Sequence, residues 1–250
     1  MVMSVAEMAV RTDDITVPWG QQPHQLDSQY ARWRTAVFES MVESRDGSKL
    51  YFLYDPETDE RSQTTGVRKG GLSIVVFDTS LKCFVAEMPL QVYGKPLSMF
   101  AQKAAAQSGG DALIVVSQTE EQDAVNVHVS RIELWPNTNS IADNRMLLNA
   151  PLRTEGEVIC TMRDDKSELV VLANPGLQVW RVDTSVNTHT PPIAHFTVPD
   201  AELEHFYDGF VSLGKVFLLS AFPDGTLDYT RIHVLSFDGH LTTEDLDPDQ

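Results

Sequence analysis

The sequence predicts an all-β protein built from about four four-stranded antiparallel sheets. Three observations predict this fold. Short apolar runs recur along the chain, polar or glycine-bearing turns precede them, and segments that partly alternate apolar and polar residues follow them. The 250 residues are 42 % hydrophobic and 22 % charged, which is ordinary for a globular protein of one or two domains.

The second strand of each predicted sheet is the most apolar segment of its unit. A turn precedes each of these strands, and residue pairs such as Asp46-Gly47 and Gly109-Gly110 favour the tight bends that such turns need. The four strands are expected at 49–54, 111–116, 168–173 and 215–220.

The remaining strands of each unit flank this central strand. First strands are expected before the turns, at 35–43, 97–105, 157–162 and 207–211. Third strands are expected at 72–78, 129–135, 177–183 and 231–238, and weaker fourth strands at 82–88, 145–149, 193–198 and 241–246. The helix formers of 99–106 leave a helical turn open as an alternative there.

Equivalent positions at or just after the ends of the third strands recur along the chain. The intervals between them are somewhat longer than a typical repeat of radially stacked small sheets. From Asp78 to Pro136, Asp183 and Asp238 the steps are 58, 47 and 55 residues. One four-stranded sheet cannot bury both faces, whereas radially stacked sheets can. The sequence therefore predicts a β-propeller-like repeat domain over 35–246, four-bladed or with an incomplete ring. A flexible N-terminal arm at 1–34 and an acidic tail at 247–250 are expected beside it.

The unit at 156–184 resembles a WD-repeat blade. Its third strand contains Val179-Trp180-Arg181 where that family commonly has Val-Trp-Asp. The Kelch family is the alternative, because Gly70-Gly71 and Gly109-Gly110 match its paired glycines. The resemblance extends loosely over 35–246 and implies a propeller that binds partners on its loops.

The charge balance excludes some classes of partner. Nineteen basic and thirty-six acidic side chains give a net charge of −17, which argues against binding to nucleic acid or to anionic lipid. The N-terminus lacks the pattern of a secretory signal, and no apolar run is long enough to span a membrane. A cytoplasmic or nuclear, non-secreted protein is expected, in which Cys83 and Cys160 are structural thiols.

The sequence carries no complete catalytic or ligand-binding motif. The segment 209–216 matches the phosphate-binding P-loop pattern except at its last position, where Val216 replaces the Ser or Thr that would hold Mg²⁺. No two of the seven histidines have the spacing of a metal-binding pair on a helix. We therefore expect no cofactor, no metal and no catalytic residue set.

Aromatic and acidic side chains are the candidates for partner contact. Phe77, Trp135 and Phe237 fall at equivalent places near the third-strand ends, and Trp180 lies two residues before its equivalent position. Packing between sheets is the favoured role for these aromatics, and any that are exposed become anchors for a partner. The loop at 200–208 adds acidic candidates, for which a solvated loop is the simpler interpretation; the residues are Asp200, Glu202 and Glu204.

These observations favour a non-enzymatic scaffold that binds proteins, with an acidic surface suited to basic peptides or basic protein faces. The alternative is a hydrolase or lyase of propeller type with a central-channel site built from Asp78, Asp183, His233 and Asp238. A third hypothesis makes the chain one subunit of a larger assembly whose remaining blades lie on another polypeptide.

Overall fold

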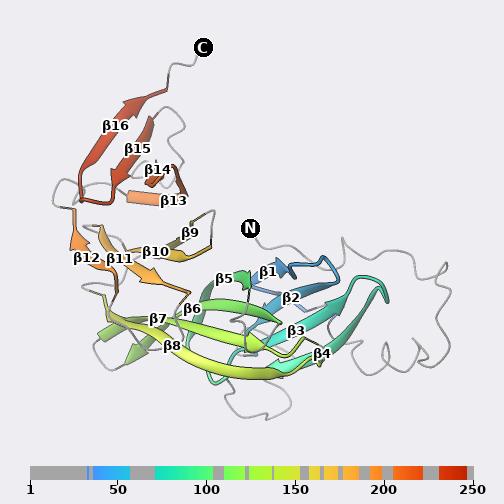
Figure 1. Cartoon of the computed structure of the whole chain (residues 1–250). Coiled ribbons are helices and arrows are strands. Elements are labelled where there is room, and N and C mark those ends of the chain that lie inside the picture. Colours follow the sequence, from blue (N-terminus) through green and yellow to red (C-terminus); the bar gives the residue numbers. More distant parts are fainter. Residues whose placement is uncertain are drawn as a thin grey trace. The chain divides into compact units, whose positions relative to one another are not determined.

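The computed structural model describes residues 33, 36–56, 71–103, 110–121, 124–136, 138–152, 158–163, 166–173, 177–185, 192–198, 205–221 and 231–246. These residues form strands, turns and loops, and no α-helix occurs among them. The strands make four four-stranded antiparallel sheets (Figure 1).

The first two sheets follow chain order, so each strand pairs with its neighbour in sequence. The first sheet consists of β1 (Ser40–Glu43), β2 (Lys49–Tyr54), β3 (Ser73–Asp78) and β4 (Cys83–Pro89). The second consists of β5 (Lys95–Lys103), β6 (Asp111–Glu121), β7 (Ala124–Leu134) and β8 (Ile141–Pro151).

The third and fourth sheets repeat this simple up-and-down order. The third consists of β9 (Val158–Met162), β10 (Glu168–Ala173), β11 (Gln178–Asp183) and β12 (Ala194–Thr197). The fourth consists of β13 (His205–Ser212), β14 (Lys215–Ala221), β15 (Arg231–Ser236) and β16 (Leu241–Asp245). The predicted all-β, β-propeller-like architecture of four sheets is therefore confirmed.

The predicted strand positions agree closely with the structure, with two informative differences. The segment with helix formers is the regular strand β5, because pairing with β6 along most of its length overrides the local helix propensity. The strands β6, β7 and β8 have eleven residues each and extend beyond the predicted apolar segments.

The chain divides into two compact units. The first comprises residues 1–119 and 129–145, and it contains the first sheet and most of the second. The second comprises residues 120–128 and 146–250, and it contains the third and fourth sheets with the remaining ends of β6, β7 and β8. Each unit has its own hydrophobic core.

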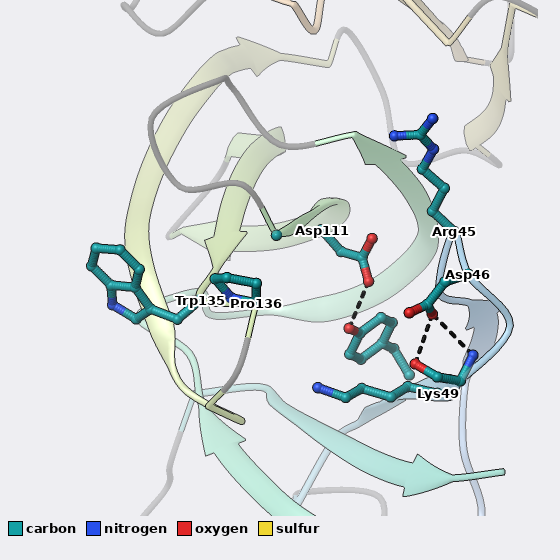
Figure 2. A pocket seen from close by; sticks show the side chains of 9 residues that line it. Arg45, Asp46, Lys49, Asp111, Trp135 and Pro136 are labelled. Carbon is teal, nitrogen blue, oxygen red and sulfur yellow. Dashed lines mark hydrogen bonds between the residues drawn. The ribbon is translucent and has the colours of Figure 1, made fainter. Parts of the chain in front are cut away.

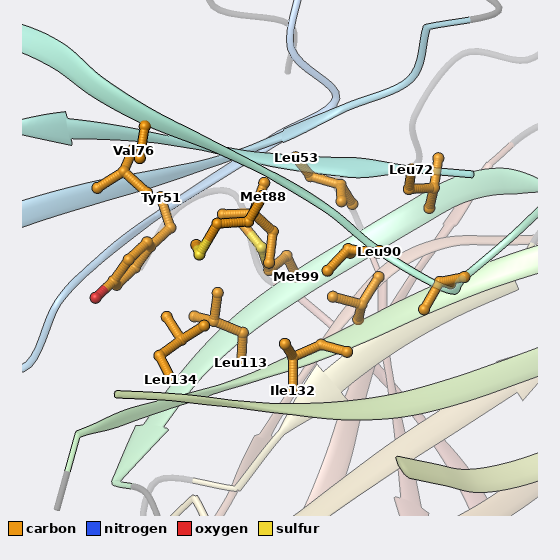
Figure 3. Packing of buried hydrophobic residues seen from close by; sticks show 14 residues of the cluster. Tyr51, Leu53, Leu72, Val76, Met88, Leu90, Met99, Leu113, Ile132 and Leu134 are labelled. Atoms are coloured by element: carbon orange, nitrogen blue, oxygen red, sulfur yellow. The ribbon is translucent and has the colours of Figure 1, made fainter. Parts of the chain in front are cut away.

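The core of the first unit lies between the first and second sheets. Figure 3 shows Leu53 and Met88 of the first sheet gathered with Met99, Leu113 and Ile132 of the second. Leu53, Leu113 and Ile132 are completely buried, and each such side chain stabilises the fold by about 1.5–3 kcal/mol. This packing holds the two sheets together as one body.

A second cluster covers the other face of the first sheet. Trp33, Ala36 and Phe38 precede β1 and pack against Phe52 and Tyr54 of β2. The Trp33 ring meets the Tyr54 ring edge-on at 4.6 Å between centroids. Trp33 lies within the stretch predicted as an N-terminal arm, yet it is only 2 % exposed and belongs to this core.

The core of the second unit joins the third and fourth sheets. Val170 and Leu172 of β10 share it with Val216 and Leu218 of β14, and all four are completely buried. The backbone N–H of Val211 also donates to the Thr161 hydroxyl at 3.2 Å, which links β13 to β9.

A recurring turn follows the third strand in the first and third sheets. The tripeptides 78–80 and 183–185 both read Asp-Thr-Ser, and in each the aspartate Oδ1 accepts from the backbone N–H and the hydroxyl of the serine. Thr79 and Thr184 donate from backbone and hydroxyl to carbonyls of the turn before the second strand. The motif therefore ties the two turns at one end of each sheet.

Candidate functional site

The candidate site is an open pocket of about 320 Å³ in the first unit. It lies where the turn before β2, the start of β6 and the end of β7 meet (Figure 2). Segments that are far apart in the sequence make this surface. The lining residues are Arg45, Asp46, Ser48, Lys49, Tyr51, Gly110, Asp111, Trp135 and Pro136.

A hydrogen bond between the first and second sheets forms one wall of the pocket. The Tyr51 hydroxyl donates to Asp111 Oδ2 at 2.8 Å. Burial of the phenol, followed by the negative charge of Asp111 and this hydrogen bond, raises the pKa of Tyr51 well above its ordinary value of 10.0. Tyr51 therefore stays a neutral donor in the ordinary range of pH and fixes one oxygen of Asp111.

The turn of residues 44–48 makes the opposite wall. Asp46 Oδ1 accepts from the Ser48 hydroxyl at 2.7 Å, the Ser48 backbone N–H at 3.0 Å and the Ser44 hydroxyl at 2.9 Å. These hydrogen bonds, those from Ser48 first, lower the pKa of Asp46 to about 2. The carboxylate is consequently ionised across the physiological range of pH.

Two cations also line the pocket. Neither Arg45 nor Lys49 makes an ion pair with another described residue. With Asp46 and Asp111, they give the lining a mixed charge. The pocket can therefore donate and accept charged hydrogen bonds.

Trp135 supplies the aromatic surface of the site. It follows directly after β7 and is 49 % exposed. Its backbone N–H donates to the Ser140 carbonyl at 3.1 Å, which fixes the backbone while the indole remains accessible.

Close approach of the neighbouring backbone requires a glycine at position 110, because a Cβ there would lie 2.1 Å from the Leu134 carbonyl oxygen.

The other predicted aromatic candidates are partly or fully buried. Trp180 is 3 % exposed and stacks on His195 across β11 and β12, with 5.0 Å between ring centroids. Phe77 packs edge-on against Phe84 within the first sheet. Of the four aromatics, Trp135 is the one that the structure leaves exposed.

Phe237 takes part in an ion-pair network of the second unit. The Arg181 guanidinium lies 4.1 Å from the Phe237 ring centroid and bonds both oxygens of Glu168, at 2.5 and 3.1 Å. Arg163 lies 3.6 Å from the same carboxylate. Because Glu168 is 4 % exposed, this network neutralises a buried charge between the third and fourth sheets.

The polar residues of the enzyme alternative serve turns and packing in the structure. The carboxylates of Asp78 and Asp183 accept from their own turns, and Asp238 accepts from Ser236 of the last turn. His233 is 1 % exposed; its ring nitrogens bond the hydroxyls of Thr243 and Ser220 at 2.9 and 3.0 Å. Each group has a local structural role.

Several other sequence predictions can be located. The P-loop-like segment 209–216 lies on the β13–β14 hairpin and not at the start of a helix. Cys83 and Cys160 are not joined in a disulfide bond, and burial raises the pKa of Cys160 to about 12. The acidic candidates Asp200, Glu202 and Glu204 lie outside the described residues.

Metal-binding clusters and membrane-spanning helices are both absent from the described residues. Nowhere in the described ranges do three or more His, Cys, Asp or Glu side chains gather in a way that could hold a metal ion. The same part of the chain contains no helix with the length and apolar character needed to cross a membrane.

Sequence reasoning missed most of the pocket. The sequence predicts Asp46 and Gly110 as turn residues and Asp111 as the start of a strand, but nothing in it shows that these turns meet. The available signal was the recurrence of charged residues in turns at the same end of successive sheets. Trp135 was the one lining residue predicted as a contact.

No protein-family model matches the sequence, and no curated protein matches it significantly. Similar solved structures include a mutant apocarotenoid oxygenase from Synechocystis, with 13 % identity, a TM-score of 0.44 and coverage of 83 % of this chain and 48 % of that one. The calcium-binding protein regucalcin from Agrobacterium tumefaciens has 12 % identity and a TM-score of 0.49, with coverage of 86 % and 64 %.

The β-propeller domain of Cps50 (Swd1) from Myceliophteria thermophila is also similar, with 8 % identity, a TM-score of 0.46 and coverage of 88 % and 57 %. The chain thus spans about half to two thirds of the length of these proteins. At such identities the activities and partners of these proteins are not transferred. The chain itself has an all-β, β-propeller-like fold of four four-stranded antiparallel sheets.

Proposed function

We propose that the chain is a non-enzymatic scaffold of β-propeller type that binds other proteins. The observation that carries this proposal is the exposed Trp135 beside the pocket between the first and second sheets. Tryptophan is prominent among residues that dominate binding energy, and loops on a rigid β scaffold commonly carry binding residues. The blades are WD-repeat-like in this proposal, and the protein acts in the cytoplasm or nucleus, alone or within a larger assembly.

Basic peptides or basic protein faces are the proposed partners. The net charge of −17 attracts cations over distances comparable to the Debye length. At the pocket, one basic side chain of the partner would lie on the exposed Trp135 ring in a cation–π contact, and a second would lie beside the Asp111 carboxylate, because the indole is turned away from Asp111 (Figure 2). Arg45 and Lys49, at the same pocket, would turn toward solvent when the partner binds.

The proposal is tested with synthetic peptides of matched length, one rich in arginine and one rich in glutamate. Fluorescence anisotropy of the labelled peptides against the full chain measures the affinity. We expect the basic peptide to bind, and Trp135→Ala to weaken it about tenfold, which corresponds to the loss of about 1.4 kcal/mol. Tyr93→Ala is the matched control, because Tyr93 is an aromatic residue of the same unit that is 63 % exposed and does not line the pocket.

Two results would contradict the proposal in different ways. Preference for the glutamate peptide would mean that Arg45 and Lys49 dominate the pocket, and the basic partner would be rejected. Binding that Trp135→Ala leaves unchanged would reject this pocket as the contact surface.

A further inference from the structure

We propose that the outer face of the fourth sheet binds a second copy of this chain. The outer face is the side of β13–β16 turned away from the third sheet, and its apolar members are Phe210, Phe217, Leu219, Ile232 and Val234. Their neighbours in sequence establish this orientation. Val211, Val216, Leu218 and Leu235 belong to the core shared with the third sheet, and successive side chains of a strand point to opposite faces.

The outer face exposes apolar surface on its edge strand β13 and on the adjoining β14, whereas Val234 of β15 is buried. Phe210 is 51 % exposed, and its ring is stacked on that of Phe217 with 5.1 Å between centroids and 11° between planes. Leu219 and Ile232 beside them are only partly buried. A contiguous apolar patch on a strand surface is typical of an interaction site.

The packing of the other sheets indicates what fits such a face. In the first unit, one face of the first sheet packs on the second sheet, and Trp33 and Phe38 cover the other face. In the second unit, the third and fourth sheets share a core. A further sheet face is therefore the natural occupant, because apolar sheet surfaces interdigitate at a spacing of about 10 Å.

A lysine at one end of the outer face can pair with acidic residues at the other end of the same face in a second copy. Asp208 pairs with Leu219, and Glu244 pairs with Ile232, so both acids lie at one end of the apolar residues. Lys215 pairs with Ser212 and Ser236 and lies at the other end, where Asp238 accepts from the Ser236 hydroxyl. A two-fold axis across the strands would place the lysine end of one copy over the acidic end of the other.

The response to salt distinguishes the proposed dimer from an association that is mainly ionic. Two chains of charge −17 repel each other at long range, and added salt screens this repulsion. The apolar part of the contact resists screening, and the few rim pairs that salt weakens are small beside the repulsion between the two net charges. Self-association is therefore expected to strengthen with salt.

Sedimentation velocity of the full chain tests the proposal, at about 1 to about 200 µM protein and at about 50 and about 500 mM NaCl. We expect a monomer–dimer equilibrium that shifts toward dimer at the higher salt. Phe210→Ser removes an apolar contact from both copies and should weaken the dimer at least about tenfold. Leu213→Asn is the matched control, because Leu213 lies on the same hairpin, is 93 % exposed and lies at the turn beyond the outer face.

Charge reversal tests the predicted pairing across the two-fold axis. Asp208→Lys and Lys215→Asp alone should each weaken the dimer, and the double variant should restore it. Thermal unfolding of each variant shows that the monomer remains folded. A chain that stays monomeric at the highest concentration and salt would overturn the proposal, and so would a dimer that Phe210→Ser leaves unchanged.

Discussion

Trp135 and Trp180 show how position along a strand decides the role of a side chain. Trp180 lies within β11, where Val171 of β10 and His195 of β12 flank it on both sides. Trp135 follows the last residue of β7, and its backbone N–H bonds Ser140, which precedes β8. Both residues are contact candidates because they are tryptophans. Trp135 is exposed because it lies past the end of its strand, whereas Trp180 is buried within one. Sequence patterns place strand ends only to within a few residues, so they do not separate the two cases.

The hydrogen bond from Tyr51 to Asp111 makes a first prediction at this scale. Tyr51→Phe should lower the free energy of unfolding by about 1 kcal/mol at neutral pH, because it removes one hydrogen bond between the first and second sheets and little else. Urea unfolding measures this change. Tyr93→Phe, at an exposed position, should leave stability within about 0.5 kcal/mol of the parent protein.

The same residue predicts a dependence on pH. The pKa of Tyr51 is raised in the folded protein, so above about pH 10 the unfolded chain loses the phenol proton while the folded chain keeps it. The unfolded state then binds fewer protons, and the stability of the parent protein falls with rising pH by up to about 1.4 kcal/mol per pH unit from this group. The advantage over Tyr51→Phe should therefore shrink above about pH 10. A constant difference up to about pH 11 would show that the phenol has an ordinary pKa.

Arg181 makes the strongest residue-scale prediction. Arg181→Ala would remove the bidentate partner of the buried Glu168 and its contact with Phe237, which should destabilise the chain by about 2–4 kcal/mol. Arg181→Lys should recover only part of this loss, because an ammonium lacks the planar fork of donors. Urea unfolding compares these variants with Arg145→Ala.

Arg145 is the control because its partner Asp143 is 35 % exposed at the side chain and Arg145 itself is 42 % exposed. Loss of a surface ion pair should change stability by less than about 1 kcal/mol. Equal effects at Arg181 and Arg145 would show that the burial of Glu168 has no energetic consequence.

At the scale of elements, alternation and turn chemistry predicted most of the fold. β2 and β10 begin and end where their apolar runs do, and a turn precedes each of them. The ends of β7 and β8 could not be predicted, since 124–128 and 141–144 contain polar residues that cross-strand pairing keeps extended. Local sequence carries no information about such pairing.

In the turn of the β13–β14 hairpin, the residue type at one position does not suit the backbone conformation. The turn residues Leu213 and Gly214 both have positive φ, at 49° and 73°. A leucine is strained in this conformation, whereas Asn-Gly is the preferred pair for such a turn. Leu213→Asn should therefore raise the free energy of unfolding by about 0.5–1 kcal/mol.

The midpoint of urea unfolding measures the effect of Leu213→Asn. Tyr93→Asn is the control, since Tyr93 is exposed but is not among the described residues with positive φ. A decrease in stability for Leu213→Asn would mean that the side chain of Leu213 makes a stabilising contact that outweighs its backbone strain.

At the scale of the whole molecule, the fold class could be predicted and the candidate site could not. Each sheet forms from neighbours in sequence, so its pattern is readable locally. The pocket joins residues 45–51, 110–111 and 135–136, whose proximity depends on how one sheet packs on the next. The outer face of the fourth sheet is likewise defined only when its other face is known to be buried.

The net charge of −17 supplies the last prediction, because it favours binding of a basic peptide at one proposed surface and opposes dimerisation at the other. A basic peptide at the Trp135 pocket gains from long-range attraction, so its affinity should fall as NaCl rises from about 50 to about 500 mM. Dimerisation through the outer face of the fourth sheet works against repulsion and should strengthen over the same range.

Two measurements on one preparation separate these associations at each salt concentration. Fluorescence anisotropy measures the affinity for the basic peptide, and sedimentation velocity measures dimerisation. Phe210→Ser should weaken the dimer at least about tenfold and leave the peptide affinity unchanged, whereas Trp135→Ala should weaken peptide binding about tenfold and leave the dimer unchanged. If both associations weakened together with salt, dimerisation would be ionic and the apolar face would not be its cause. If one variant removed both associations, a single surface would serve both, and the separation of the two sites would be wrong.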